Sequence, residues 1–106
     1  METNELATMI EACTRCVQAC EKCAFQCCAL KGQEYAECLK ACVTCLQICS
    51  LCISLCGRDD KLGKDIMTLC AKACELCAIE CEKHMDVLCK ECAKACRECV
   101  KVCKGG

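Results

Sequence analysis

"CLKACVTCLQICSLCISLC", the stretch from Cys38 to Cys56, contains six cysteines separated by steps of 4, 3, 4, 3 and 4 residues. This spacing places side chains along one face of an α-helix. In a helical bundle, leucine and isoleucine normally occupy that face and form the core. Thiols therefore take the positions in which a hydrophobic core is expected, and the role of the protein depends on why they do.

The same spacing recurs in four segments of the chain. The cysteines of these segments are Cys13, Cys16, Cys20, Cys23 and Cys27 with an additional Cys28; Cys38, Cys42, Cys45, Cys49, Cys52 and Cys56; Cys70, Cys74, Cys77 and Cys81; and Cys89, Cys92, Cys96, Cys99 and Cys103. The pattern predicts helices over residues 4–31, 34–56, 60–83 and 86–104. Four such helices joined by short loops predict an all-α fold, an antiparallel up-down-up-down four-helix bundle with a cysteine-lined core, in one domain over residues 1–106.

Glycine and aspartate residues mark the expected joints between these helices. Gly32 closes the first segment, and Gly57 is expected at the C′ position that follows the second helix. Asp59 or Asp60 is expected to cap the third helix, and Asp86 the fourth.

Composition excludes several classes of protein. Cysteine supplies 21 of the 106 residues, and the formal net charge is −1. Without a basic cluster, we expect no binding to nucleic acid or to an anionic membrane. The apolar stretch 42–57 is shorter than a membrane span and contains polar residues. The start of the sequence lacks the features of a signal peptide, so we expect a cytoplasmic protein with reduced thiols.

Three roles of the thiols other than metal binding are disfavoured. If the cysteines only filled space, about twenty core positions would carry a smaller side chain than leucine. Each methylene lost in this way would cost about 0.8 kcal/mol of burial. Disulfides along one helix fail on geometry, because i,i+4 neighbours lie about 5–6 Å apart and a disulfide needs Cβ atoms about 3.8 Å apart. A thiol redox protein normally places Cys-x-x-Cys at the start of a helix that follows a strand, whereas the seven such pairs here lie inside helices.

Metal binding accounts for the pattern. Nine Cys-x-x-x-Cys pairs use eighteen of the 21 cysteines. Two sulfurs at i and i+4 stack on one helix face and can bind one ion between them without bending the backbone. The same spacing on four facing helices predicts that all 21 cysteines are metal ligands.

Charge favours a monovalent ion. Soft thiolates bind Cu(I), Zn(II) or iron–sulfur clusters. If the buried cysteines were all thiolates, zinc in four-thiolate sites would leave a large uncompensated negative charge in the core. About one Cu(I) per thiolate would bring the core close to neutrality, because each ion brings one charge and accepts two or three ligands. Iron–sulfur clusters usually need ligands on loops. A zinc or mixed-metal thiolate buffer is the alternative in the same chemistry.

Two stretches, "CAKACELCAIECEKH" at 70–84 and "CKECAKACRECVKVC" at 89–103, together with the Cys-x-x-x-Cys pairs of every helix, resemble the bacterial four-helix-bundle copper storage proteins of the cytosolic type. The resemblance covers essentially the whole chain. It implies a storage protein and not an enzyme, without catalytic residues, that binds many Cu(I) ions through the thiolates of its core. It also implies a homotetramer of bundles.

Soft side chains extend the cysteine series at both bundle ends. Met9 precedes Cys13 and Met67 precedes Cys70, which would place both thioethers at one end. His84 follows Cys81 and Met85 precedes Cys89 at the other end. These four residues are candidate entry ligands that could pass Cu(I) inward, although methionines also serve as ordinary core residues and His84 as a loop histidine.

The second helix is apolar on both sides of its cysteines. Its flanking residues are Leu39, Val43, Leu46, Ile48, Leu51, Ile53 and Leu55. This exceeds what one bundle core needs, and it predicts either deeper burial within the monomer or, as we favour, an interface between subunits.

Overall fold

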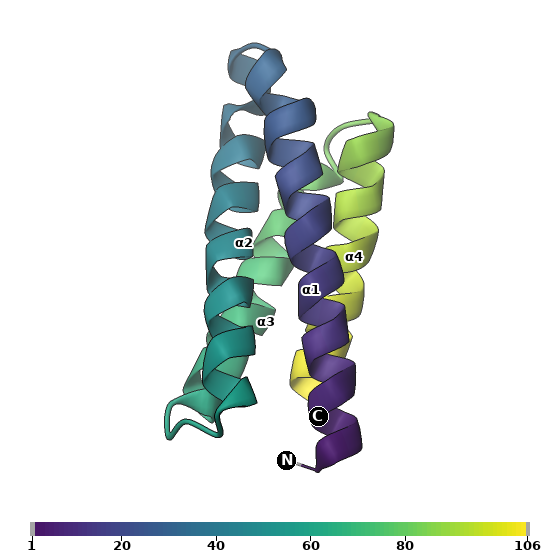
Figure 1. Ribbon diagram of the computed structural model, residues 1–106. Coiled ribbons are helices and arrows are strands. Elements are labelled where there is room, and N and C mark those ends of the chain that lie inside the picture. The colour runs from purple at the N-terminus through teal and green to yellow at the C-terminus, as the bar shows by residue number, and fades with distance from the viewer. Residues whose placement is uncertain (1, 106) are drawn as a thin grey trace.

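A computed structural model describes residues 2–105 as four α-helices (Figure 1). They are α1 (Thr3–Gln26), α2 (Ala36–Gly57), α3 (Gly63–Cys81) and α4 (Val87–Gly105). Two short 3-10 helices, η1 (Cys28–Leu30) and η2 (Gln33–Tyr35), lie between α1 and α2. No strand occurs within residues 2–105, and the predicted all-α fold is confirmed.

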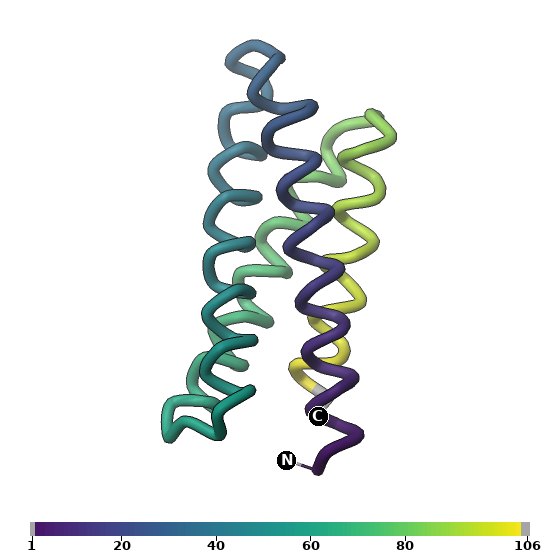
Figure 2. Tube along the Cα trace, viewed as in Figure 1, coloured from purple at the N-terminus to yellow at the C-terminus, as the bar shows by residue number. Residues whose placement is uncertain are grey.

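The helices form a closed antiparallel bundle. Each helix packs against its neighbours in sequence, and α4 packs against α1. The result is a rod of 42 × 18 × 18 Å (Figure 2). We call the end that carries the α2–α3 loop, the start of α1 and the end of α4 the lower end, and the end that carries the other two loops the upper end (Figure 1).

The cysteines form the core of the rod. All 21 are buried, and most of them are completely inaccessible to solvent. Small residues flank them on the helix faces and let the helices approach closely; the buried ones are Ala12, Ala24, Ala71, Ala73, Ala78 and Ala93. The buried part of residues 2–104 contains no polar or charged side chain, so the metal donors there are the thiols and the thioether of Met9.

The first helix ends earlier than predicted. We expected it to reach residue 31, but it ends at Gln26, and Cys27 has φ −132° and ψ −73°. A regular helix would turn Cys28 about 100° away from Cys27 and out of the core. The 3-10 turn of η1 instead keeps both thiols buried.

The C-terminal cap of α2, at the start of the α2–α3 loop, lies at a different residue from the one predicted. Gly57 remains helical, and Asp59 takes the left-handed conformation with φ 53°. The amide of Asp60 donates to the carbonyl of Leu55 at 2.9 Å, and that of Asp59 to Cys56 at 3.1 Å. This is a Schellman motif with aspartate at C′. The expectation for Gly57 was therefore wrong, because the backbone turns two residues later.

Asp60 does not act as the predicted N-cap of α3. The residue at that position is Leu62, and no side chain caps the helix there. The carboxylate of Asp60 accepts a 2.9 Å hydrogen bond from the Leu62 amide, inside the loop. Asp86 directly precedes α4, and its carbonyl accepts the amide of Lys90 at 3.0 Å, as expected of a capping position.

The outer face of α2 is apolar and only partly covered. Residues 39, 43, 46, 48 and 53 are half-buried, and Leu51 is 49% exposed. By length and composition, the segment Gln33–Gly57 would be long and apolar enough to cross a membrane, with a mean hydropathy of 1.8. Core helices of soluble proteins show the same property, and the six cysteines of α2 are buried in the bundle.

Candidate metal centre

The thiols of different helices lie in contact along the bundle axis. Cys16 in α1 is a central example, because its sulfur lies 3.7 Å from that of Cys45, 3.8 Å from that of Cys74 and 3.6 Å from that of Cys96. Each of these partners belongs to a different helix. Similar contacts occur toward both ends, at 3.7 Å between Cys13 and Cys99 and at 3.6 Å between Cys38 and Cys81.

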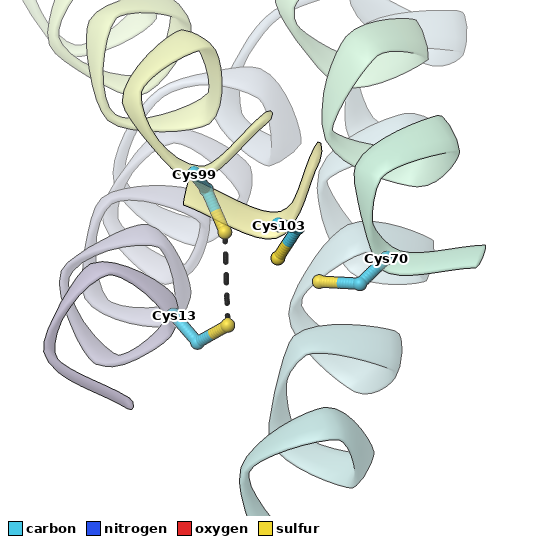
Figure 3. A group of neighbouring side chains, drawn as sticks. All are labelled: Cys13, Cys70, Cys99 and Cys103. Atoms are coloured by element: carbon cyan, nitrogen blue, oxygen red, sulfur yellow. Dashed lines mark hydrogen bonds between the residues drawn. The ribbon is translucent and has the colours of Figure 1, made fainter. Parts of the chain in front are cut away.

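These contacts combine into groups of four sulfurs, all within 4.8 Å of one another. Five of the groups are Cys13/Cys70/Cys99/Cys103, Cys16/Cys49/Cys74/Cys99, Cys16/Cys20/Cys45/Cys96, Cys20/Cys77/Cys92/Cys96 and Cys23/Cys28/Cys38/Cys89. Figure 3 shows the first of them, with side chains from α1, α3 and α4 converging on one point.

The sulfur spacing fits a shared metal ion. Two metal–sulfur bonds of about 2.3 Å that meet at a trigonal or tetrahedral angle place their sulfurs about 3.8–4.0 Å apart. The cross-helix sulfur distances are 3.5–4.0 Å. The thiols are therefore already arranged for thiolate coordination, and little movement of the helices is needed.

Cross-helix contacts dominate over the predicted i,i+4 pairs. Two pairs within one helix are in direct contact, Cys45 with Cys49 at 3.9 Å and Cys77 with Cys81 at 4.0 Å. The i,i+4 spacing matters in another way, since three of the four-sulfur groups contain such a pair together with thiols of other helices.

Four of the five groups, all except Cys23/Cys28/Cys38/Cys89, share cysteines with a neighbouring group. Cys16 belongs to two of the five groups, and the same is true of Cys20, Cys96 and Cys99. These four groups cannot each hold an ion with ligands of its own. A thiolate that serves two groups must bridge two ions.

The pKa values of the thiols follow from burial and from contacts with other thiols. Burial, as the main cause, raises the pKa of Cys28 to about 12 and that of Cys56 to about 11. Deeper in the core, the nearby Cys20 thiol lowers the pKa of Cys16, and the Cys16 thiol raises the pKa of Cys20. Such a pair therefore gives up its first proton more readily than its second.

Comparison with known proteins places this arrangement in a family. Residues 2–105 match the family model described as copper storage protein. The chain belongs to the copper storage protein family. The resemblance noted in the sequence is thereby confirmed.

Two solved structures of this family are closely similar. The Cu(I)-bound copper storage protein BsCsp3 is 35% identical, with a TM-score of 0.90 over 95% of this chain and 96% of that chain. The metal-free copper storage protein 3 from Bacillus subtilis is also 35% identical, with a TM-score of 0.86 over 93% of this chain and 95% of that chain. No curated protein matches the sequence significantly.

The four candidate entry ligands of this copper storage protein lie in different surroundings. Met9 is buried, with its sulfur 3.5 Å from that of Cys13 and 3.9 Å from that of Cys52. Met67 is half-buried and lines a surface pocket together with Cys56 at the lower end. Met85, at the upper end, is 78% exposed.

His84 is part of a cluster that the sequence did not reveal. Its ring stacks on Tyr35, with ring centroids 3.9 Å apart. The hydroxyl of Tyr35 donates to Asp86 at 2.6 Å, and Lys31 forms an ion pair with the same carboxylate at 3.3 Å. We call these four residues the upper clasp. Their separation in sequence, up to 55 positions, explains why no local pattern indicates them.

Proposed function

We propose that this protein stores Cu(I) in high capacity, as thiolate-bound ions along the bundle core, with all 21 cysteines as ligands and about one copper ion per cysteine. The sharing of cysteines between successive four-sulfur groups carries the proposal. Bridging thiolates allow a continuous series of ions, each held by two or three sulfurs, instead of a few separate sites.

Charge supports copper over zinc. The core contains no cationic side chain among the described residues, so bound ions alone must neutralise the thiolates. Zinc, in sites of four thiolates, would fill about five positions and leave roughly half the charge uncompensated. The Cu(I)-bound state of a relative with 35% identity over nearly the whole chain also favours copper as the cargo here.

The test is an anaerobic titration of the fully reduced protein with Cu(I), followed by desalting and copper analysis. We expect about one tightly bound copper per thiol, with the helical signal intact. A parallel titration with Zn(II) is the control. Uptake that stops at a handful of ions, with equal uptake of zinc, would support a zinc or mixed-metal buffer and overturn the proposal.

We propose a storage role without catalysis. A thiol redox protein, the rival from another class, would need an accessible thiol at the start of a helix, whereas the cysteines here are buried within the bundle. Disulfide reductase activity of the metal-free protein would contradict this view. We also propose that residues 1–106 form one domain, that the protein is cytoplasmic, and that it binds neither nucleic acid nor membranes.

The outer face of α2 is the proposed interface between bundles, in a homotetramer as is expected from the family resemblance. Leu51 lies exposed among half-buried aliphatic residues. Leu51→Glu should reduce the oligomer mass measured by light scattering, because burying an unpaired carboxylate is costly. Gln18→Glu, which adds the same charge on the exposed face of α1, should leave the mass unchanged. A monomeric wild type, or flotation with lipid vesicles, would refute this assembly.

A further inference from the structure

We propose that the four-sulfur group Cys23/Cys28/Cys38/Cys89, at the upper end of the bundle, is a Zn(II) site that holds one ion in the absence of copper and releases it when Cu(I) is abundant. The proposal adds a second metal to the function proposed above and confines it to one group of thiols. It rests on how this group is built and on its place among the helix termini.

The group is separate from the four other groups named above, because it shares no cysteine with any of them. Its four sulfurs come from four different elements: Cys23 from α1, Cys28 from η1, Cys38 from α2 and Cys89 from α4. It can therefore hold one ion with four ligands of its own, as a structural zinc site requires. The shared thiolates of the other groups instead suit ions that accept two or three ligands.

The sulfur positions fit a tetrahedral site. The sulfur of Cys23 lies 3.8 Å from that of Cys28 and 3.6 Å from that of Cys89. Zinc–sulfur bonds of about 2.3 Å in tetrahedral geometry need sulfurs about 3.8 Å apart. All four sulfurs lie within 4.8 Å of one another, so small rotations of the side chains are enough to close the site.

Cys28 departs from the regular pattern of its segment and completes the group. It directly follows Cys27, outside the steps of 3 and 4 that the other cysteines keep. A regular helix would turn its side chain away from the core. The end of α1 at Gln26 and the 3-10 turn of η1 instead bury Cys28, which is only 2% exposed. The break in the helix thus supplies the fourth ligand.

Two helix N-termini support the charge of such a site. Four thiolates around Zn(II) leave about two negative charges uncompensated. Cys38 lies in the first turn of α2, which begins at Ala36, and Cys89 lies in the first turn of α4, which begins at Val87. The positive ends of two helix dipoles therefore lie beside two of the four thiolates and stabilise them.

The four-sulfur group of Figure 3, at the lower end, has the opposite surroundings. Its Cys103 lies in the last turn of α4, which ends at Gly105, and the helix dipole disfavours negative charge there. Its Cys99 is shared with a neighbouring group. Zinc should therefore bind at the lower end much less tightly than at the upper end.

The upper clasp limits the negative charge beside the proposed site. Asp86 directly precedes α4, and its carboxylate alone would disfavour nearby thiolates. Lys31 forms an ion pair with this carboxylate at 3.3 Å, and the hydroxyl of Tyr35 donates to it at 2.6 Å. The charge of Asp86 is thus balanced within the clasp.

Copper is expected to displace the zinc ion, because soft thiolates prefer Cu(I). Cys81, which lies outside the group, has its sulfur 4.0 Å from that of Cys23 and 3.6 Å from that of Cys38. After displacement, these thiolates can bridge to Cu(I) ions in the rest of the core. The zinc site therefore does not reduce the copper capacity proposed above.

The experiment compares Cys28→Ser with the matched control Cys103→Ser. Each variant removes one thiol of a four-sulfur group near one end of the rod, and serine replaces a soft donor by a hard one. Reduced, metal-free protein is titrated anaerobically with Co(II), whose visible absorption reports tetrahedral thiolate coordination. Zn(II) then displaces the cobalt in competition with a chromophoric chelator, which gives the zinc affinity.

Wild type and Cys103→Ser should each bind one tightly held zinc ion per chain, and Cu(I) should release it. Cys28→Ser should bind zinc more weakly by more than about a hundredfold, since the loss of even an outer-shell partner costs about 10–100-fold. An equal effect of the two substitutions, a loss in Cys103→Ser alone, or several tightly held zinc ions in wild type would overturn the site.

Copper content separates this site from the proposed function. Absence of tight zinc binding in wild type, with about one copper still bound per thiol, would refute the zinc site and leave storage intact. Wild type that holds only a few copper ions would instead refute the proposed function. Each variant lacks one copper ligand, so the copper contents of the two should fall by the same small amount.

A second measurement uses wild type alone and does not depend on the folding of a variant. Hydrogen exchange is compared between metal-free protein and protein with one Zn(II) per chain. Zinc should slow the exchange of the Lys31 amide, which donates to the carbonyl of Cys28 at 3.1 Å, and should leave the lower-loop amide of Asp60 unchanged. Unchanged exchange at Lys31, or slowing at Asp60 alone, would contradict the proposed site.

Discussion

The phenol of Tyr35 donates a 2.6 Å hydrogen bond to the carboxylate of Asp86, and so joins the loop after α1 to the loop before α4. The same contact lowers the pKa of Asp86, mainly because the phenol stabilises its charged form. The sequence positions are 51 apart, so this bond closes a long loop and holds the upper ends of the helices together.

Tyr35→Phe should therefore loosen the upper end without affecting the lower end. The ring stack on His84 would remain, but the charge-assisted bond would be lost. In hydrogen exchange, we expect faster exchange of the upper-loop amides of Lys31 and His84, and unchanged exchange of the lower-loop amide of Asp60. Unchanged exchange at all three amides would show that the clasp contributes nothing to closure.

The stability of the metal-free protein should fall in alkaline solution. Burial, as the main cause, raises the pKa of Cys56 to about 11 from the ordinary 9.0. An unfolded chain loses this proton near pH 9, whereas the folded chain keeps it up to about pH 11. The contribution of Cys56 is thus fully present below about pH 9 and is lost as the pH rises toward about 11.

Urea unfolding under anaerobic, reducing conditions at several pH values measures this effect. The urea concentration at the unfolding midpoint should decrease as the pH rises from about 9 to about 11. In the Cys56→Ala variant, this decrease should be smaller. The copper-loaded protein should lack the dependence, since its thiols are already deprotonated. A midpoint that rises over this pH range would contradict the assignment.

Much of the fold could be predicted from the sequence because one periodicity determines it. Cysteines at steps of 3 and 4 define a single buried face on each helix, and four such faces can only be buried against one another. The proposed site follows from the same pattern, since the proposed ligands are the core cysteines themselves. What the pattern could not show is which sulfurs of different helices meet, such as Cys16 with Cys96.

The loops were less predictable, for two physical reasons. Caps depend on the backbone conformation of single residues, so Gly57 was expected to turn the chain where Asp59 does so. The clasp depends on contacts distant in sequence, which leave no periodic signal. The early end of α1 at Gln26 has the first of these causes, because two adjacent thiols, Cys27 and Cys28, cannot both face the core from a regular helix.

Asp59→Gly should stabilise the protein. Asp59 has φ 53°, a conformation in which a Cβ atom is unfavourable and glycine is not. After the greater entropy of glycine in the unfolded chain is subtracted, we expect a gain of about 0.5 kcal/mol in the free energy of unfolding. Arg58→Gly is the matched control, because Arg58 has an ordinary φ of −105° and should lose stability on substitution. The two changes should shift the urea midpoint in opposite directions. A lower stability of the Asp59→Gly variant would contradict the assignment of Asp59 to the left-handed position of the Schellman motif.

Copper loading should raise the melting temperature by tens of degrees. In the metal-free core, sulfurs such as those of Cys49 and Cys70 meet at 3.5 Å through weak thiol contacts only. Cu(I) replaces these contacts by bonds that cross-link α2 to α3 and α1 to α4. A single ion at a thousandfold excess over its Kd stabilises the folded state by about 4.1 kcal/mol, and many ions contribute. Calorimetry at increasing copper-to-protein ratios should show a progressive rise that a strong Cu(I) chelator reverses. If the melting temperature stayed constant while copper bound, the ions would lie on the surface, and the core would not be the store.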